Sequence, residues 1–344
     1  MASVYDRHCN TEGVPPRFDT VSFLSDYGAA DEFVGVVKSV IRSIEPRVTV
    51  VDITHEIQPY DVKAGALTLA RSVQYLCPGV VLAVVDPGVG TDRRAIAIEV
   101  GDGQSYLVGP DNGLLASAVG MVGGATAAVE LTNPEYRLAS PGPTFDGRDV
   151  FGPAAAHLCA GVPLDALGPS VDPAELVPGL VPLPRDEDGA IVGEVLWVDR
   201  YGNCQLNIDP DQIGSWGDRV QLRWTRPTEG TRTALRVRAF DELGSGQVGL
   251  VVDSYGLLAV AMSRSSAADT LQIAAGDELA LVPLDDEAGQ GGEGPAGNGA
   301  RVQRDSVGRQ TDAARGGGRG RAGASSPDSP VSPVRLRPRR PAGP

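Results

Sequence analysis

The chain has 344 residues, 42% of them hydrophobic, which is enough for two packed domains and excludes a small scaffold that depends on disulfides. The formal net charge is −14, but residues 288–344 hold ten Arg against four acidic residues, which leaves residues 1–287 at −20 and argues against nucleic-acid binding by this acidic body. No run approaches the roughly eighteen apolar residues of a membrane span, and the first residues lack an apolar signal core, so we expect a cytoplasmic protein with no membrane partner. The four Cys are widely spaced and suggest neither a zinc site nor a disulfide framework.

Strand and helix signals alternate over the first two thirds of the chain, after a segment, residues 1–19, that we predict to be disordered. Residues 21–28 are an apolar run that ends in Asp-Tyr-Gly, and apolar residues then recur at helical spacing from Phe33 to Ile44. Residues 47–53 and 80–86 indicate two further strands, and Asp61 is suited to cap the helix between them. This order predicts an α/β domain over residues 20–172, with a mostly parallel sheet sandwiched by helices.

The alternation of strand and helix signals ends at a proline-rich stretch, and we assign residues 173–188 to a linker. Residues 189–287 contain short β-type runs separated by Gly, Asp and Ser, with one short helical candidate at residues 266–271. This pattern predicts a smaller antiparallel β-barrel-like domain. In residues 288–344, Gly and Pro supply 20 of 57 residues and no aromatic residue occurs, so we predict a disordered tail.

Chemically suited residues follow the predicted strands of the first domain. Active sites of parallel sheets lie at the carboxyl ends of the strands, where Asp26, His55 and Asp86 fall. Asp86 opens a Pro-Gly-Val-Gly-Thr turn, and Arg93, seven residues on, is placed to return toward it. A carboxylate held by an Arg can orient a water molecule. A purely structural Asp-Arg pair at a turn is the alternative.

A second group of residues lies in the segment PTFDGRDVFGPAAAHL, residues 143–158. Gly147 interrupts the chain just before a helical pattern, in which Asp149 is suited to an N-cap. Asp146, before the glycine, has no such structural role. His157 lies within the helical pattern, and we interpret it as a packed histidine.

Six segments together make the sequence similar to a known family. FLSDYG, VVDITHEIQPYDVKAGA, VVDPGVGTDRRA, GPDNGLL, TFDGRDVFGPAAA and VDRYGNCQLNI resemble segments of the S-adenosyl-L-methionine hydrolase, or hydroxide adenosyltransferase, family, which is related to fluorinase and chlorinase. The resemblance covers approximately residues 20 to 285 in the expected order. It implies a homotrimer with sites between subunits and no cofactor.

The resemblance also implies a set of site residues. Asp26 would hold the ribose hydroxyls, Asp31 would lie near the methionine ammonium, and Tyr60 would wall the sugar and methionine. From the β domain of a neighbouring subunit, Asp199 and Ser254 would contact the methionine end, Asn203 and backbone near Arg264 would read the adenine edge, and Tyr201 and Phe240 would flank its face. For these two aromatic residues, core packing is the alternative. The full substrate-binding set comprises Asp26, Asp31, Tyr60, Thr144, Phe145, Gly147, Asp199, Tyr201, Asn203, Phe240, Ser254 and Arg264.

The residues implied for catalysis are Asp86, Arg93 and Asp146. The halogenases resemble one another in having a neutral tyrosine at the position of Asp86, since a carboxylate would repel a halide in a poorly solvated pocket. Asp86 therefore favours water as the nucleophile. The hydrolases that this pattern resembles most have a His where this chain has Asp146, and an ionised Asp donates no hydrogen bond.

The expected reaction is hydrolysis of S-adenosyl-L-methionine to adenosine and L-methionine by in-line attack of water or hydroxide at the ribose C5′. Two alternatives stay open. One is a halide-dependent, chlorinase-like adenosyl transfer. The other is a catalytically weak protein that binds S-adenosylmethionine or adenosine, suggested by the replacement of the family His by Asp146.

Overall fold

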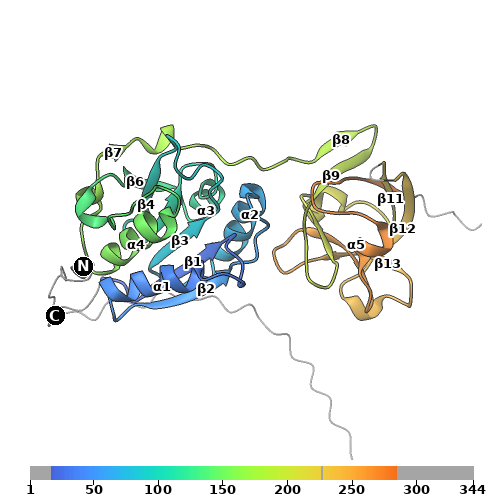
Figure 1. Cartoon of the computed structure of the whole chain (residues 1–344). Coiled ribbons are helices and arrows are strands. Elements are labelled where there is room, and N and C mark those ends of the chain that lie inside the picture. Colours follow the sequence, from blue (N-terminus) through green and yellow to red (C-terminus); the bar gives the residue numbers. More distant parts are fainter. Residues whose placement is uncertain (1–16, 226–227, 285–344) are drawn as a thin grey trace, which may run out of the picture. The chain divides into compact units, whose positions relative to one another are not determined.

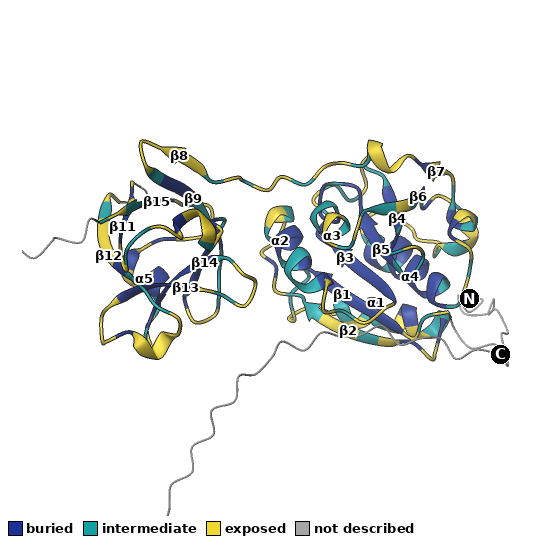
Figure 2. Cartoon of the chain, turned by 180° about the vertical axis from the view of Figure 1, so that it is seen from behind, coloured by how far each residue is buried: buried dark blue, intermediate teal, exposed yellow. Residues whose placement is uncertain are grey.

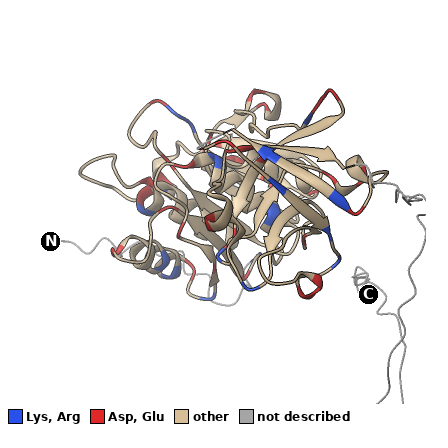
Figure 3. Ribbon diagram, turned by 90° about the vertical axis from the view of Figure 1, so that its right-hand side faces the viewer, with Lys and Arg blue, Asp and Glu red and all other residues tan. Residues whose placement is uncertain are grey.

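The computed structural model describes residues 17–225 and 228–284 (Figure 1). The predicted tail, residues 288–344, and residues 1–16 of the predicted N-terminal segment lie outside these ranges. Within them, no helix is long and apolar enough to cross a membrane. Acidic residues are interspersed with Lys and Arg along the described chain (Figure 3).

The N-terminal sheet has the strand order β2-β1-β3-β5-β4-β6-β7. Its parallel part is formed by β1 (Thr20–Ser25), β2 (Thr49–Thr54), β3 (Val80–Val84) and β5 (Ser105–Pro110). The other strands, β4 (Ala95–Val100), β6 (Ala125–Glu130) and β7 (Ser170–Val171), continue the sheet in antiparallel pairings. The predicted α/β sheet is confirmed, and the antiparallel extension is a feature that was not predicted.

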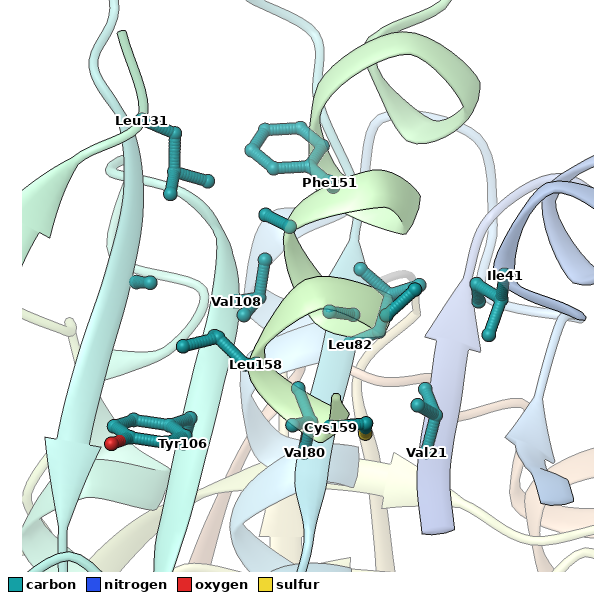
Figure 4. Packing of buried hydrophobic residues seen from close by; sticks show 14 of the residues in the cluster. Val21, Ile41, Val80, Leu82, Tyr106, Val108, Leu131, Phe151, Leu158 and Cys159 are labelled. Atoms are coloured by element: carbon teal, nitrogen blue, oxygen red, sulfur yellow. The ribbon is translucent and has the colours of Figure 1, made fainter. Parts of the chain in front are cut away.

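Helices cover both faces of this sheet (Figure 1). Helices α1 (Phe33–Ile44) and α4 (Gly152–Cys159) pack on one face, and α2 (Val62–Val73) and α3 (Ala116–Met121) contribute to the core on the other. Because side chains alternate along a strand, Val80 and Leu82 of β3 enter the first core and Val81 and Ala83 the second. Figure 4 shows Leu82 and Val80 packed beneath α4. As predicted, the Asp61 carboxylate caps α2, accepting from the Ala64 amide at 2.8 Å.

A π-helical turn, η2 (Gly147–Phe151), leads directly into α4. The Gly152 amide donates to the Gly147 carbonyl, five residues back, which is the π-type hydrogen bond. The interpretation of Asp149 as an N-cap is wrong. The turn begins earlier, with Asp146 at its N-cap position, so Asp149 lies inside the turn. Asp149 is buried there and forms an ion pair with Arg148 at 2.6 Å.

The second β region has the order β10-β14-β13-β12-β11-β15-β9-β8, and an additional pairing of β9 with β10 closes the strands into a barrel. The predicted barrel-like domain is confirmed, with one parallel pairing, between β12 and β13. Its core includes Val195, Leu206 and Val260. In Figure 2 the exposed residues of β8 contrast with the buried strands β1 and β3 of the N-terminal sheet. The strands are β8 (Arg185–Glu187), β9 (Ala190–Val198), β10 (Cys204–Leu206), β11 (Arg219–Trp224), β12 (Gly230–Arg236), β13 (Val248–Val252), β14 (Leu258–Met262) and β15 (Glu278–Pro283).

Short helices complete the described fold. Helix α5 (Ala267–Leu271) corresponds to the predicted helical candidate and is capped by Ser266, whose hydroxyl accepts from the Asp269 amide at 2.9 Å. The short 3₁₀ helices are η1 (Pro134–Tyr136), η3 (Leu164–Leu167), η4 (Pro173–Glu175), η5 (Pro210–Ile213) and η6 (Phe240–Glu242).

Candidate active site

The carboxyl ends of β1, β2 and β3 meet at one edge of the N-terminal sheet, as predicted. The Asp26 amide donates to the Val84 carbonyl at 3.3 Å, and the Gly28 amide donates to the His55 carbonyl at 2.7 Å. These backbone bonds hold the segment after β1 between the ends of its two neighbouring strands. The edge therefore offers a fixed base for side chains from three separate parts of the sequence.

Arg93 lies between two carboxylates at this edge. Its Nε atom is 3.0 Å from each oxygen of Asp86, and its Nη2 atom donates to both Asp86 and Asp146. The three side chains are nearly buried, with exposed fractions of 6% for Asp86 and 12% for Arg93 and Asp146. Burial by itself would lower the pKa of Arg93, but the bonds to Asp86 and Asp146 raise it overall, so the guanidinium stays charged. With both carboxylates ionised, one positive charge faces two negative ones.

A turn after β3 and a close approach of two loops bring these three side chains together. In the turn, the Val89 amide donates to the Asp86 carbonyl at 3.3 Å, and the loop then returns Arg93 to the carboxylate as predicted. Gly90 has a φ of +76°, and a Cβ there would lie 2.8 Å from the Pro143 carbonyl oxygen. The absence of a side chain thus lets this loop pack closely against the segment that carries Asp146.

Asp26 and Tyr60 are linked across the same edge. The Asp26 carboxylate accepts from the Tyr60 amide at 2.9 Å, and Tyr60 has a φ of +70°. Burial raises the pKa of Asp26, the Tyr60 and Asp26 amides offset part of that rise, and the charge of Asp86 adds to it. The Tyr60 side chain is 73% exposed. Asp31 and Thr144 are also exposed.

An aromatic cluster lies beside the carboxylates, and it contains a residue that the sequence reasoning missed. The ring centroid of Phe145 is 5.7 Å from that of Tyr27 and 5.0 Å from that of Phe33. Tyr27 follows Asp26 directly, and its phenol packs against Gly147. The only sequence signal was its place in the Asp-Tyr-Gly segment after β1.

The barrel residues of the predicted site are centred on Asp199. Its carboxylate accepts from the Tyr201 amide at 2.8 Å, the Asn203 amide at 2.9 Å and the Asn203 side chain at 2.8 Å. Because Cys204 of β10 pairs with Val260 of β14 in antiparallel fashion, Asn203 and Arg264 lie at the same end of these two strands. Arg264 is exposed and has a φ of +55°.

Tyr201, Phe240 and Ser254 of the barrel are exposed residues. Tyr201 is 79% and Phe240 50% exposed, so the alternative that they are core residues is wrong. Ser254 is exposed, next to Asp253, which accepts from the Tyr255 amide at 2.8 Å. Among the described residues, neither Phe240 nor Ser254 forms a hydrogen bond to Asp199, so their assignment to the site stays a prediction.

The two histidines of the described chain have structural partners. His55 Nδ1 is 2.8 Å from the Ser25 hydroxyl and its Nε2 is 3.0 Å from Asp52. His157 packs on Tyr136, and burial lowers its pKa to about 4. It is the packed histidine that the sequence indicated. The described residues contain no group of three or more His, Cys, Asp or Glu side chains that could hold a metal ion.

A cavity of about 420 Å³ lies elsewhere in the N-terminal domain. Its lining is largely apolar and includes Ile98, Leu115, Val119 and Leu176, together with Asp111. None of the predicted site residues lines it. The chemistry of the strand-end site is therefore separate from this cavity.

Comparison with known sequences places this arrangement in a family. Residues 21–168 match the S-adenosylmethionine (SAM) hydroxide adenosyltransferase N-terminal domain, and residues 193–280 match the C-terminal domain of that family. The chain belongs to the SAM hydroxide adenosyltransferase family. The resemblance seen in the six sequence segments is thus confirmed, whereas the predicted domain limits stay a prediction.

Named relatives agree with this assignment. A Salinispora tropica protein named (R)-S-adenosyl-L-methionine hydrolase is 45% identical over 75% of this chain and 96% of its own length. A Thermus thermophilus protein of the same name is 40% identical over 76% of this chain and 99% of its own. A fluorinase from an Actinoplanes species is more distant, at 28% identity over 74% of this chain and 95% of its own.

Solved structures show the same fold. The crystal structure of an uncharacterized conserved protein from Thermotoga maritima superposes with a TM-score of 0.69 at 34% identity, covering 76% of this chain and 99% of that one. A conserved hypothetical protein from Thermus thermophilus gives a TM-score of 0.60 at 35% identity, covering 77% of this chain and all of the other.

Proposed function

We propose that this SAM hydroxide adenosyltransferase family member hydrolyses S-adenosyl-L-methionine to adenosine and L-methionine. The observation that carries the proposal is the sharing of Arg93 by Asp86 and Asp146 at the strand-end edge. Relatives at 40 to 45% identity carry the name of this activity. Nearly buried carboxylates can hold a water molecule by its protons, and Arg93 fixes their positions.

The reaction needs little chemical assistance beyond positioning. The water oxygen forms a bond to the ribose C5′ as the bond from C5′ to the sulfonium sulfur breaks, and methionine leaves as a neutral thioether. The departing group needs no proton. The proton of the attacking water passes to the Asp86 carboxylate, and placement of the nucleophile in line supplies much of the acceleration.

Substrate binding follows the predicted assignments. The Asp26 carboxylate would accept from the ribose hydroxyls, Asp31 would face the methionine ammonium, and the exposed ring of Tyr60 would wall the sugar. The exposed rings of Tyr201 and Phe240 suit stacking on adenine. These rings, with Asp199, Asn203, Ser254 and Arg264, would come from a neighbouring subunit of a homotrimer, and a cytoplasmic location is part of the same proposal.

Incubation with S-adenosylmethionine, with and without chloride, followed by chromatography tests this proposal. Adenosine in equal amounts under both conditions is the expected result, because two carboxylates around Arg93 disfavour a halide in the same place. A chloride-dependent halonucleoside would indicate the chlorinase-like alternative. Unchanged substrate would indicate a catalytically weak binding protein. An Asp86→Asn variant prepared in parallel reports any contaminating activity.

A further inference from the structure

We infer that Tyr27 is a positioning residue for the attacking water, with its phenol hydroxyl donating a hydrogen bond to the water oxygen. The inference rests on the proposed function and adds a group that neither the sequence motifs nor the family assignment singled out. It is supported by the position of the hydroxyl, by the charged groups that act on it and by its lack of a hydrogen-bond partner among the described residues.

The hydroxyl lies against Gly147, within the segment that carries Asp146. A Cβ added at Gly147 would meet the Tyr27 oxygen closer than any real Cβ contact, and it would lie 3.1 and 3.2 Å from two ring carbons, Cζ and Cε2. The phenol thus occupies the space that a side chain at position 147 would take. A glycine is required at position 147 because the Tyr27 phenol lies so close to the backbone there.

The groups that act on the Tyr27 hydroxyl are those of the proposed site. Burial raises the pKa of Tyr27 far above its usual range, the charges of Asp26, Asp86 and Asp146 raise it further, and Arg93 lowers it. The phenol therefore stays protonated and keeps its proton available as a donor. The hydroxyl thus lies within electrostatic range of all four charged groups of the proposed site.

The hydroxyl has no hydrogen-bond partner among residues 17–225 and 228–284. Its ring, by contrast, is held by Phe23, Phe33 and Phe145, with centroids 5.6 to 6.4 Å away. Its backbone amide donates to the Ser25 hydroxyl at 3.3 Å. A hydroxyl whose ring is packed and partly buried, and which bonds to none of the described residues, is available to a water molecule or ligand in the site.

This placement provides what the carboxylates lack. Ionised Asp86 and Asp146 accept hydrogen bonds only, so they can hold a water by its two protons. Both bonds leave the oxygen lone pairs free. A phenol donating to one lone pair leaves the other directed at C5′, so Tyr27 fixes the orientation of the nucleophile without removing its proton.

Tyr27→Phe removes only the hydroxyl and keeps the ring. We expect kcat for adenosine formation to fall about 10- to 100-fold, with KM for S-adenosylmethionine changed by less than about twofold. The melting temperature should not fall, since no protein hydrogen bond is lost. Tyr136→Phe is the matched control, because Tyr136 is a partly buried tyrosine of the same domain that packs on His157, and it should retain wild-type kcat.

A second variant moves the hydroxyl to the other side of the same contact. Gly147→Ser alone should reduce activity, because its side chain collides with the phenol. In the double variant Tyr27→Phe/Gly147→Ser, the ring has to give only a few tenths of an ångström, and the serine hydroxyl lies near the vacated position. We expect the double variant to regain part of the kcat lost in Tyr27→Phe.

The outcomes separate this inference from the proposed function. A wild-type chain that forms no adenosine refutes the proposed function. An active wild type with unchanged kcat in Tyr27→Phe overturns the role of Tyr27 alone. So does a loss that Tyr136→Phe reproduces or that accompanies a lowered melting temperature, since packing would then explain it. A folded double variant no more active than Tyr27→Phe also contradicts the placement of the hydroxyl.

Discussion

Arg93 and Arg94 are adjacent in the sequence, yet each forms a different kind of ion pair. Arg94 bonds to Asp111 at 2.8 Å, and the other Asp111 oxygen accepts from the Val177 amide at 2.8 Å. Both oxygens of this buried carboxylate are bonded, and the second carboxylate near Arg94, that of Glu175, lies 4.0 Å away and is 70% exposed. Arg93 instead serves two carboxylates, Asp86 and Asp146.

The two ion pairs share some features and differ in one. Asp86 and Asp111 are both buried, with exposed side-chain fractions of 6% and 3%, and both contact an Arg. Burial and pairing are therefore common to the two. Of the two arginines, only Arg93 is shared by two nearly buried carboxylates, and their excess negative charge leaves acceptor capacity for an external proton donor such as water.

The largest expected effect is on catalysis at Asp86. Asp86→Asn keeps the size of the side chain but removes the charge that polarises the water, so we expect turnover to fall by at least about a thousandfold. Binding of S-adenosylmethionine, measured by calorimetry, should change little. Turnover equal to wild type would contradict the proposal that Asp86, unlike Asp111, takes part in the reaction.

Variants at Asp146 test whether the second carboxylate of the cluster contributes as Asp86 does. Asp146→Ala should lower kcat by roughly ten- to a thousandfold, since one of the two water acceptors is lost. Asp146→His restores the residue that the family hydrolases resembling this chain carry, and we expect it to retain or increase adenosine formation. The pH-rate profiles of wild type and both variants provide the measurement. Three superimposable profiles would show that Asp146 does not contact the nucleophile.

Asp111→Asn is the matched substitution in the satisfied pair. It removes the buried charged partner of Arg94 and leaves only the exposed Glu175 at 4.0 Å, so we expect the free energy of unfolding to fall by about 2 to 4 kcal/mol. Turnover per folded molecule should stay within about twofold of wild type. Denaturant titration and active-site-normalised kinetics measure the two effects. A selective loss of turnover, with stability intact, would contradict a purely structural role for this pair.

The smallest expected effect concerns the pH dependence of substrate binding through Asp26. The ionised carboxylate accepts from the ribose hydroxyls, whereas a proton on it competes with the substrate. Since burial raises the pKa of Asp26, affinity should begin to fall at a higher pH than for an ordinary Asp, by about tenfold for each pH unit below that pKa. Calorimetric titrations across acidic pH should show this slope in wild type and lose it in Asp26→Asn.

Local sequence signals predicted the parts of the site that depend on nearby residues. The strand ends at Asp26 and Asp86, the cap at Asp61 and the return of Arg93 all follow from patterns within a dozen residues. Asp149 was misassigned because an acidic residue before a helical pattern is also the usual signal for an N-cap. A π-turn gives no comparable signal.

Contacts between distant residues could not be predicted in the same way. Asp111 and Arg94 are brought together by the antiparallel pairing of β4 and β5, which the strand-helix alternation did not indicate. Tyr27 meets Gly147 across 120 positions of the sequence. Such a meeting depends on how the elements pack, and no spacing rule encodes it.

The π-helical turn before α4 influences the direction in which Asp146, at its N-cap position, projects. Each residue of an ordinary helix rotates the direction of the side chain by about 100° about the helix axis. The buried face of α4 fixes the orientation of that helix, and thereby the directions of the side chains in the turn that leads into it. Deleting one residue between Gly147 and Phe151 would convert the turn to α-type spacing and rotate Asp146 away from Arg93. We therefore expect the length of this segment, independently of its composition, to determine whether Asp146 reaches Arg93.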